Sequence, residues 1–410
     1  MKRRVRLPFL SLAAALASAW GADWPQFRGP HGNGASDETG FAWRLDAAEN
    51  LAWQVALPGR GLSSPIVVGG RVFVTAASGP RQEELRVLCF QTIDGTLRWE
   101  RRFWATGRTM CHPKTCVAAP TPASDGERVY ALFSSCDLIC LNFDGQLVWF
   151  RGLTHDYPNV SNSLGMSSSL VAADGVVVAQ VETDTESYAL GLDGLTGVNR
   201  WRLDRPRLAN WTSPVLLPAE GGPRQVALQS GRGVAGVEVR TGRAVWNYGE
   251  GASTIASSAM SGPRLFVPSF GLTALDLDAA GGPPRQAWRA GNLRPATSSP
   301  AVLGDRVYVI NDAGVLSCGD AANGRRVWQV RLNGPISASP VAAEGHLVAI
   351  SEKGVVQVVD LSGSEGEVVA ERDLQATILG TPALANGALY VRSDGSLWKF
   401  AAENARRKTR

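Results

Sequence analysis

Residues 51–57 read LAWQVAL, and the same shape returns later in the chain as LRWERRF (97–103), LVWFRGL (147–153) and VWQVRL (327–332). In the later cases the tryptophan segment ends a unit of roughly forty residues. LAWQVAL has no such unit in front of it. The chain therefore opens with the end of a repeat, and the place where that end belongs decides the fold.

A doublet of small residues followed by an apolar segment occurs eight times in the chain. Two β-rich segments, a turn with glycine and a segment with tryptophan follow in most of these units. Four short strands at this period predict one blade of a β-propeller. Taking the same place in each doublet, the units start at Ser64, Thr121, Ser168, Ser213, Ser258, Ser299, Ser339 and Thr381. We expect these residues on the innermost strands, near the axis.

The eighth unit lacks a tryptophan strand. It has its doublet at Thr381 and two further strand segments, and no tryptophan strand follows. LAWQVAL supplies it, because Trp53 precedes Ser64 by 11 residues, a spacing found at other junctions. The two ends of the chain then share a blade and close the ring, which removes open sheet edges. We predict an all-β, eight-bladed β-propeller of four-stranded blades over residues 51–400.

The two ends of the chain differ from the repeats. A basic start, an apolar stretch and an A-x-A site predict a secretory signal peptide over residues 1–21. Its removal takes four basic residues, so 41 becomes 37 against 37 acidic ones, and the rest is formally neutral. This balance disfavours nucleic-acid binding. The apolar stretch is too short to span a membrane. We expect a periplasmic or extracellular protein.

Residues 22–50 form an N-terminal extension, and residues 401–410 form a basic tail. The extension is rich in glycine and proline, which argues against a regular strand or helix before about residue 41. We predict that it lies across a face of the propeller or occludes its channel.

The spacing D/E-x-x-T-G-x-x-x-W occurs at Asp193–Trp201 and Glu238–Trp246. It resembles the tryptophan-docking repeat of the pyrroloquinoline quinone (PQQ)-type β-propellers, and DWPQFRGPHGNG (23–34) is similar to the opening of secreted bacterial members of that family. The resemblance covers about residues 51–400. It implies that the repeated tryptophans pack one blade against the next, namely Trp53, Trp99, Trp149, Trp201, Trp246, Trp288 and Trp328.

The resemblance leaves two functions open. One is that of a quinoprotein dehydrogenase, which binds PQQ and calcium and clamps the quinone with a disulfide of adjacent cysteines. The other is that of a non-enzymatic outer-membrane assembly factor with a docking surface. No two cysteines are adjacent in this chain. We therefore expect a monomeric, non-catalytic scaffold that binds a protein or polysaccharide of the cell envelope. A PQQ- or metal-dependent oxidoreductase is the disfavoured alternative, and we expect no bound cofactor.

Two connections between units are longer than the rest. The distance from tryptophan to the next doublet is 22 residues after Trp99 and 19 after Trp149, against 11 or 12 at the other junctions. The inserted stretches, 104–119 and 154–166, both join an outer strand to the next inner strand, so they emerge on one face beside the second blade. We predict a binding face with the candidates Arg108, His112, Lys114, His155, Asp156, Tyr157, Asn159 and Asn162.

Three of the six cysteines, Cys111, Cys116 and Cys136, fall at this face. With His112 and His155 they are candidates for one cluster. A disulfide between Cys111 and Cys116, two free thiols, and a metal or redox site all remain open. The other cysteines fall in third strands, where small buried residues are expected. No catalytic residue is predicted, because the chain has no nucleophile elbow, zinc-protease motif or P-loop.

Overall fold

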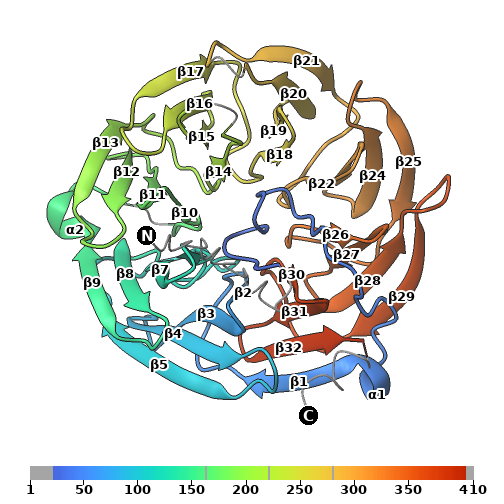
Figure 1. Cartoon of the computed structure of the whole chain (residues 1–410), viewed down its shortest axis with the longest axis horizontal. Helices are drawn as coiled ribbons and strands as arrows, with labels where there is room; N and C mark the ends of the chain where they lie inside the picture. The colour runs from blue at the N-terminus through green and yellow to red at the C-terminus, as the bar shows by residue number, and fades with distance from the viewer. Residues whose placement is uncertain (1–21, 162–163, 220–221, 279–280, 403–410) are drawn as a thin grey trace, which may run out of the picture.

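The computed structural model describes residues 22–161, 164–219, 222–278 and 281–402. The predicted signal peptide, Asn162 and residues 403–410 of the basic tail lie outside the described residues. The strands form eight four-stranded antiparallel sheets around one axis (Figure 1). This confirms the eight-bladed propeller.

The first four blades follow the order of the chain from the axis outwards. Their strands are β2 (Ile66–Val68), β3 (Arg71–Ser78), β4 (Glu84–Gln91) and β5 (Leu97–Trp104) in blade 1; β6 (Ala123–Ser124), β7 (Arg128–Leu132), β8 (Asp137–Asn142) and β9 (Leu147–Gly152) in blade 2; β10 (Val171–Ala173), β11 (Val176–Val181), β12 (Tyr188–Asp193) and β13 (Asn199–Asp204) in blade 3; and β14 (Val215–Leu216), β15 (Gln225–Ser230), β16 (Gly233–Glu238) and β17 (Ala244–Tyr248) in blade 4.

The last four blades complete the ring, and the last contains the first strand of the chain. Their strands are β18 (Ala259–Ser261), β19 (Arg264–Pro268), β20 (Leu272–Asp276) and β21 (Arg285–Ala290) in blade 5; β22 (Ala301–Leu303), β23 (Arg306–Ile310), β24 (Val315–Asp320) and β25 (Arg326–Arg331) in blade 6; β26 (Val341–Ala343), β27 (His346–Ile350), β28 (Val355–Asp360) and β29 (Glu367–Asp373) in blade 7; and β30 (Ala383–Ala385), β31 (Ala388–Arg392), β32 (Ser396–Ala401) and β1 (Leu51–Ala56) in blade 8.

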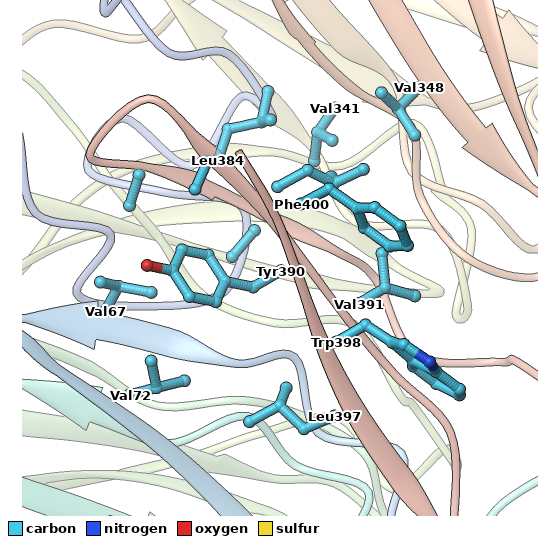
Figure 2. Packing of buried hydrophobic residues seen from close by; sticks show 14 of the residues in the cluster. Val67, Val72, Val341, Val348, Leu384, Tyr390, Val391, Leu397, Trp398 and Phe400 are labelled. Atoms are coloured by element: carbon cyan, nitrogen blue, oxygen red, sulfur yellow. The ribbon is translucent and has the colours of Figure 1, made fainter. Parts of the chain in front are cut away.

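The ring closes as the sequence predicts. β1 pairs antiparallel with β32, and Trp53 lies opposite Lys399. Figure 2 shows the packed core at this seam, where Tyr390 and Phe400 of blade 8 lie among valines of blades 1 and 7. The two helices described, α1 (Ala47–Asn50) and α2 (Leu153–Asp156), have four residues each. Within the described ranges, no helix has the length and apolar character needed to cross a membrane.

The repeated tryptophans pack between blades, and six of the seven pack against a glycine turn of the following blade. The ring of Trp99 lies under Gly145, so close that a Cβ on this glycine would be 2.6 Å from it. The indole Nε1–H of Trp99 donates to the Phe143 carbonyl of the same turn at 2.9 Å. The same contact with glycine is made by Trp53, Trp149, Trp201, Trp288 and Trp328. Trp246 is the exception among the seven. It is buried, but its Nε1–H donates to Gln225 of its own blade, because the next turn is longer.

Residues 22–46 form a segment that we call the N-terminal strap. Trp24 pairs with Val67 of blade 1 through two backbone hydrogen bonds of 2.7 and 2.9 Å. Further along the strap, Arg28 donates to the Ser258 and Pro300 carbonyls of blades 5 and 6. Gly34 then accepts from Ala342 of blade 7. The strap therefore lies across one face of the ring, as predicted, and Figure 1 shows it in blue crossing the centre before it reaches α1.

A half-buried lysine at the seam makes stability depend on pH. The Lys399 ammonium donates to the Thr92 carbonyl at 2.7 Å, and burial lowers its pKa from 10.5 to about 8. Between pH 8 and pH 10.5 the unfolded chain therefore binds more protons than the folded chain. The penalty for burying the charge is full below pH 8, and it is relieved as the pH rises towards 10.5.

We predict that Lys399→Met raises the free energy of unfolding at pH 7 by about 1–2 kcal/mol. Urea denaturation of the variant and the parent measures this difference. Thr92 retains a donor, the Trp53 indole, at 3.0 Å. The difference between the two proteins should shrink from pH 7 to pH 10. A difference that stays constant over this range would mean that Lys399 does not titrate there.

Candidate functional site

A cavity of about 400 Å³ lies on the propeller axis. Each blade contributes the segment that leads into its innermost strand, so the predicted doublet residues lie just before these strands and not on them. Two rings of residues result. The lower ring consists of Ser64, Thr121, Ser169, Ser213, Ser257, Ser299, Ser339 and Thr381. The upper ring lies two residues earlier in each blade and consists of Leu62, Ala119, Ser167, Trp211, Ile255, Thr297, Ser337 and Leu379.

The lower ring corrects two of the predicted positions. Ser169 and Ser257 line the cavity in blades 3 and 5, in place of Ser168 and Ser258. Both units lack the proline that marks the doublet in other blades, so the sequence offered two neighbouring serines at each place.

Hydrogen bonds join the lower ring from blade to blade. The Ser64 amide donates to the Thr121 hydroxyl at 2.9 Å, and the Thr121 amide donates to the Ser169 hydroxyl at 3.1 Å. The same bond, at 2.9–3.0 Å, continues around the ring to Thr381. Small hydroxyl residues therefore recur because each holds the neighbouring blade.

The two ends of the cavity differ. Phe27 of the N-terminal strap lines its lower end. The upper end opens on the face that carries every connection from an outer strand to the next inner strand, which we call the loop face. The strap contacts the turns between first and second strands, which antiparallel order places on the opposite face. A ligand or partner therefore reaches the axis from the loop face.

The first long loop (105–122) is fixed at its base and at its tip. At the base, the buried Asp137 carboxylate of blade 2 accepts from the Thr106 amide at 3.0 Å and from the Ser135 hydroxyl at 2.6 Å. Burial raises the pKa of Asp137 in spite of these bonds. At the tip, the Lys114 ammonium pairs with Glu352 of blade 7 at 2.9 Å. The loop therefore crosses part of the cavity mouth.

The second long loop (153–170) joins the first at the mouth. The His112 amide donates to the Leu164 carbonyl at 3.0 Å, and Arg108 donates to the Ser161 hydroxyl at 2.9 Å. The Trp211 indole N–H donates to the Gly165 carbonyl at 2.7 Å. The prediction that the two insertions share one face is confirmed, and both contact the rim of the axial cavity.

The structure separates the predicted binding-face residues into two groups. His112 and Lys114 line the cavity, and Arg108 links the two loops beside it. His155, Asp156 and Tyr157 do not line the cavity. Tyr157 packs on Tyr188 of blade 3, with ring centroids 4.3 Å apart, and Asp156 pairs with Arg151. The remaining described candidate, Asn159, is exposed.

The predicted cysteine and histidine cluster does not form. Cys111, Cys116 and Cys136 are all free thiols, so no disulfide joins Cys111 to Cys116. Cys116 packs in the core between blades 1 and 2, and Cys136 packs between blades 2 and 3. Across the described ranges, no three His, Cys, Asp or Glu side chains are placed to hold a metal ion. The apolar residues beside these two cysteines draw them into separate cores.

Exposed apolar side chains lie on the loop face, and sequence reasoning missed them. Phe270 is 73% exposed, Met110 53% and Ile255 48%, with Leu164 and Leu208 also exposed. All lie in connections or turns of the loop face. Two of them, Ile255 and Leu164, line the axial cavity, and large exposed apolar side chains gathered on one face are typical of a site of interaction. The spacing of two residues before each lower-ring hydroxyl would have found Ile255 and Trp211.

Cations without acidic partners lie among these apolar side chains. Arg207, Arg232 and Arg294 are exposed on the loop face. None of them pairs with a carboxylate of a described residue, in contrast to Arg289, which pairs with Glu250 at 2.8 Å. The connection that carries Arg207 is held by the buried Glu182, which accepts from Arg205 at 2.6 Å and Asn210 at 3.1 Å. The rim thus combines exposed apolar side chains with arginines that have no described carboxylate partner, and the exposed acids Asp184 and Asp312 lie on the same face.

The closed ring and the docking of tryptophan under glycine together define a propeller of the PQQ-type repeat class. A family model described as outer membrane protein assembly factor BamB matches residues 38–166, 159–267 and 272–369. The chain belongs to this family.

The individual relatives either match a smaller part of the chain or match most of it at low sequence identity. BamB of Burkholderia pseudomallei (strain K96243) is 33% identical over 128 residues, which are 30% of this chain and 32% of the relative, so the match spans about a third of that protein. The crystal structure of BamB from Moraxella catarrhalis superposes with a TM-score of 0.61 at 16% identity, covering 86% of this chain and 97% of that one.

Two dehydrogenases share the fold as well. A europium-containing methanol dehydrogenase gives a TM-score of 0.71 at 13% identity, covering 93% of this chain and 98% of that one. Quinohemoprotein alcohol dehydrogenase from Comamonas testosteroni gives 0.70 at 14% identity, covering 93% and 80%. At these identities the likeness concerns the fold alone.

Proposed function

We propose that this protein is a non-catalytic docking platform of the cell envelope that serves the assembly of outer-membrane proteins, and that it works in the periplasm. The observation that carries the proposal is the rim of the loop face, with its exposed apolar side chains and its arginines that have no described carboxylate partner. The family to which the chain belongs is described by the same function. The partner is a protein that presents acidic and apolar side chains to this rim.

The side chains of the rim are of the kinds that protein interfaces bury. Aromatic and methionine side chains such as Phe270 and Met110 are enriched at the centres of interfaces. Unpaired arginines beside them attract an acidic surface and speed encounter with it. The rim is also held in place, because Asp137, Glu182 and the Lys114–Glu352 pair fix the loops that carry it. A fixed rim loses little entropy when a partner binds.

The residues of the axial cavity do not fit PQQ with calcium. Calcium takes six to eight oxygen ligands, several of them from carboxylates. Among the described residues that line the cavity there is no aspartate or glutamate. No disulfide of adjacent cysteines is available to clamp a quinone. We therefore derive no redox step for this chain, and its likeness to dehydrogenases supports only the fold.

Placing acidic charges on the rim tests the proposal. We predict that Met110→Asp combined with Phe270→Asp, introduced into a deletion strain of the source organism, leaves folded outer-membrane β-barrel proteins severalfold below the level restored by the parent. The two carboxylates would repel an acidic partner and remove its apolar contacts. The affinity for the partner should therefore fall about tenfold or more. Both residues are exposed, so the fold should hold.

The matched control is Leu195→Asp combined with Val198→Asp. These residues are 60% and 62% exposed but lie at the outer turn of blade 3, away from the loop face. This variant should restore barrel levels fully. Normal barrel levels in the rim variant, with the protein present and folded in the periplasm, would contradict the proposed docking face. Normal levels in the deletion strain itself would contradict the proposed function.

A further inference from the structure

We propose that the axial cavity is a binding site for an apolar carboxylate, a molecule or chain end whose carboxylate terminates an apolar body. The carboxylate lies at the lower ring of hydroxyls, and the apolar body lies between the upper ring and the mouth. This site adjoins the docking rim, with which it shares Ile255 and Leu164, and it requires no metal.

The lower ring presents hydroxyl protons to the cavity. Seven of its hydroxyls each accept an amide N–H from the preceding blade. Among the residues that the structure describes, none of the seven donates its own proton to a protein acceptor. A ring of this kind offers donors from all sides of the axis. The ligand that satisfies it is rich in acceptors, and a carboxylate accepts about four hydrogen bonds.

The eighth hydroxyl is the most direct sign of a ligand. Ser64 is 1% exposed and lines the cavity. Its Oγ has no hydrogen-bond partner among the described residues, and the bond that would close the ring from the Thr381 amide is not formed. The Thr115 hydroxyl, on the same side of the cavity, is also buried without a partner in that set. Leaving a buried hydroxyl without a partner is unfavourable, so a bound acceptor is favoured at this wall.

The charges around the cavity favour an anion. No carboxylate is among the described residues that line it, and the one lysine at its mouth, Lys114, is paired with Glu352. Near its lower end, Arg28 is 1% exposed and donates only to the Ser258 and Pro300 carbonyls, each adjacent to a lower-ring serine. No described carboxylate pairs with it. In a medium of low dielectric constant this positive charge acts over several ångströms.

The upper ring and the floor supply the apolar contacts. Leu62, Ile255, Leu379 and the Trp211 indole form half of the upper ring, and Phe27 closes the cavity from below. A volume of about 400 Å³ is at the small end of ligand pockets, which span roughly 300–1,000 Å³. The ligand therefore enters with its carboxylate first, and the far end of its apolar body remains at the mouth.

Two kinds of molecule offer a carboxylate at the end of an apolar body, namely a free carboxylate and the C-terminal residue of a polypeptide. Calorimetric titration of the purified chain with octanoate tests the shared chemistry. We expect saturable one-to-one binding at least tenfold tighter than that of octanol, which has the apolar body without the charge, and tighter than that of acetate, which has the charge without the body. Equal binding of octanoate and octanol, or no heat from octanoate, would overturn the proposal.

A second pair of probes identifies the source. N-acetyl-leucyl-phenylalanine carries the carboxylate of a chain end, and its amide lacks the charge. Tighter binding of this peptide than of octanoate, with no binding of its amide, assigns the site to polypeptide ends. Tighter binding of octanoate assigns it to free carboxylates. Both titrations use the purified chain alone, so they are independent of the barrel-assembly experiment, and either proposal can fail while the other stands.

Two serines provide matched variants. Ser64→Ala removes the unpartnered donor of the cavity wall, and we expect octanoate binding to weaken about tenfold. Ser168→Ala removes a hydroxyl that is equally buried and unpartnered within the described residues but does not line the cavity, and octanoate binding should not change. Neither variant breaks a protein hydrogen bond of the hydroxyl, so both should fold. Equal affinities for the two variants would show that the hydroxyl ring does not hold the anion.

The upper ring gives an independent check. Ile255→Glu places a negative charge where the apolar body lies and should abolish octanoate binding, whereas Ile255→Gln, of the same size, should weaken it only a fewfold. Ile255 is 48% exposed, so neither change buries a polar group. Similar losses from both variants would mean that charge does not govern binding.

Discussion

Replacing Trp24 by alanine is expected to lower the free energy of unfolding by about 3–5 kcal/mol, because the indole is a large side chain buried in a packed site. Trp24 is 1% exposed and anchors the N-terminal strap on blade 1. Its ring lies against the backbone of Gly29, where a Cβ would be 2.7 Å from the indole. The alanine variant therefore loses the contact that folds the strap back on itself. Urea unfolding followed by fluorescence measures the change.

Two further tryptophan variants make the test specific. Trp24→Phe should cost much less, since the indole Nε1–H has no partner among the described residues. Trp104→Ala should change stability by less than about 0.5 kcal/mol, because Trp104 is 69% exposed. If Trp24→Ala and Trp104→Ala were equally stable, the strap would contribute nothing to the ring.

Glu182→Ala is expected to cost about 3–5 kcal/mol, because removing one partner of a buried ion pair leaves the other charge uncompensated. The Glu182 side chain is fully buried and that of Arg205 is 9% exposed. Gln180 and Asn210 also donate to the carboxylate, at 3.0 and 3.1 Å. Burial raises the pKa of Glu182 even beside Arg205. Chemical denaturation at pH 7 gives the cost.

Glu182→Ala should also loosen the connection that carries Arg207 and Leu208 of the docking rim. Arg205 and Asn210 bracket this connection, and both lose the carboxylate that they bind. Glu127→Ala is the control. Glu127 pairs with Arg128 at 2.9 Å, but it is 76% exposed, and exposed pairs contribute about 0–1 kcal/mol. Equal losses for the two variants would mean that Glu182 and Arg205 do not act as a buried pair.

The repeat made the fold predictable from the sequence, because a blade is a local unit whose strands, turns and tryptophan recur at a fixed period. Even the missing strand of blade 8 could be located, since Trp53 keeps the spacing of the other junctions. The face of the long loops was also predictable, because antiparallel order alone decides where each connection emerges. The prediction went wrong at single residues within these loops.

Packing across the ring explains those errors. Cys116 and Cys136 are close to His112 and His155 in the sequence, but their side chains turn into two different cores. The contact of Lys114 with Glu352 joins segments 238 residues apart, and no local pattern indicates it. Likewise the apolar rim is assembled from turns of several blades, each with one exposed side chain. Only the spacing of Ile255 and Trp211 relative to the serines carried a local signal.

The pairing of β1 with β32 has a consequence for how the chain is made and delivered. The ribosome produces β1 first and β32 last. Leu51 therefore cannot pair with Phe400, its neighbour in the finished sheet, until β32 has been made. A contact of such sequence separation forms slowly. During that interval the first strand has an unpaired edge, which is prone to aggregation. The closed ring thus leaves the edge of β1 exposed in the growing chain until β32 has been made.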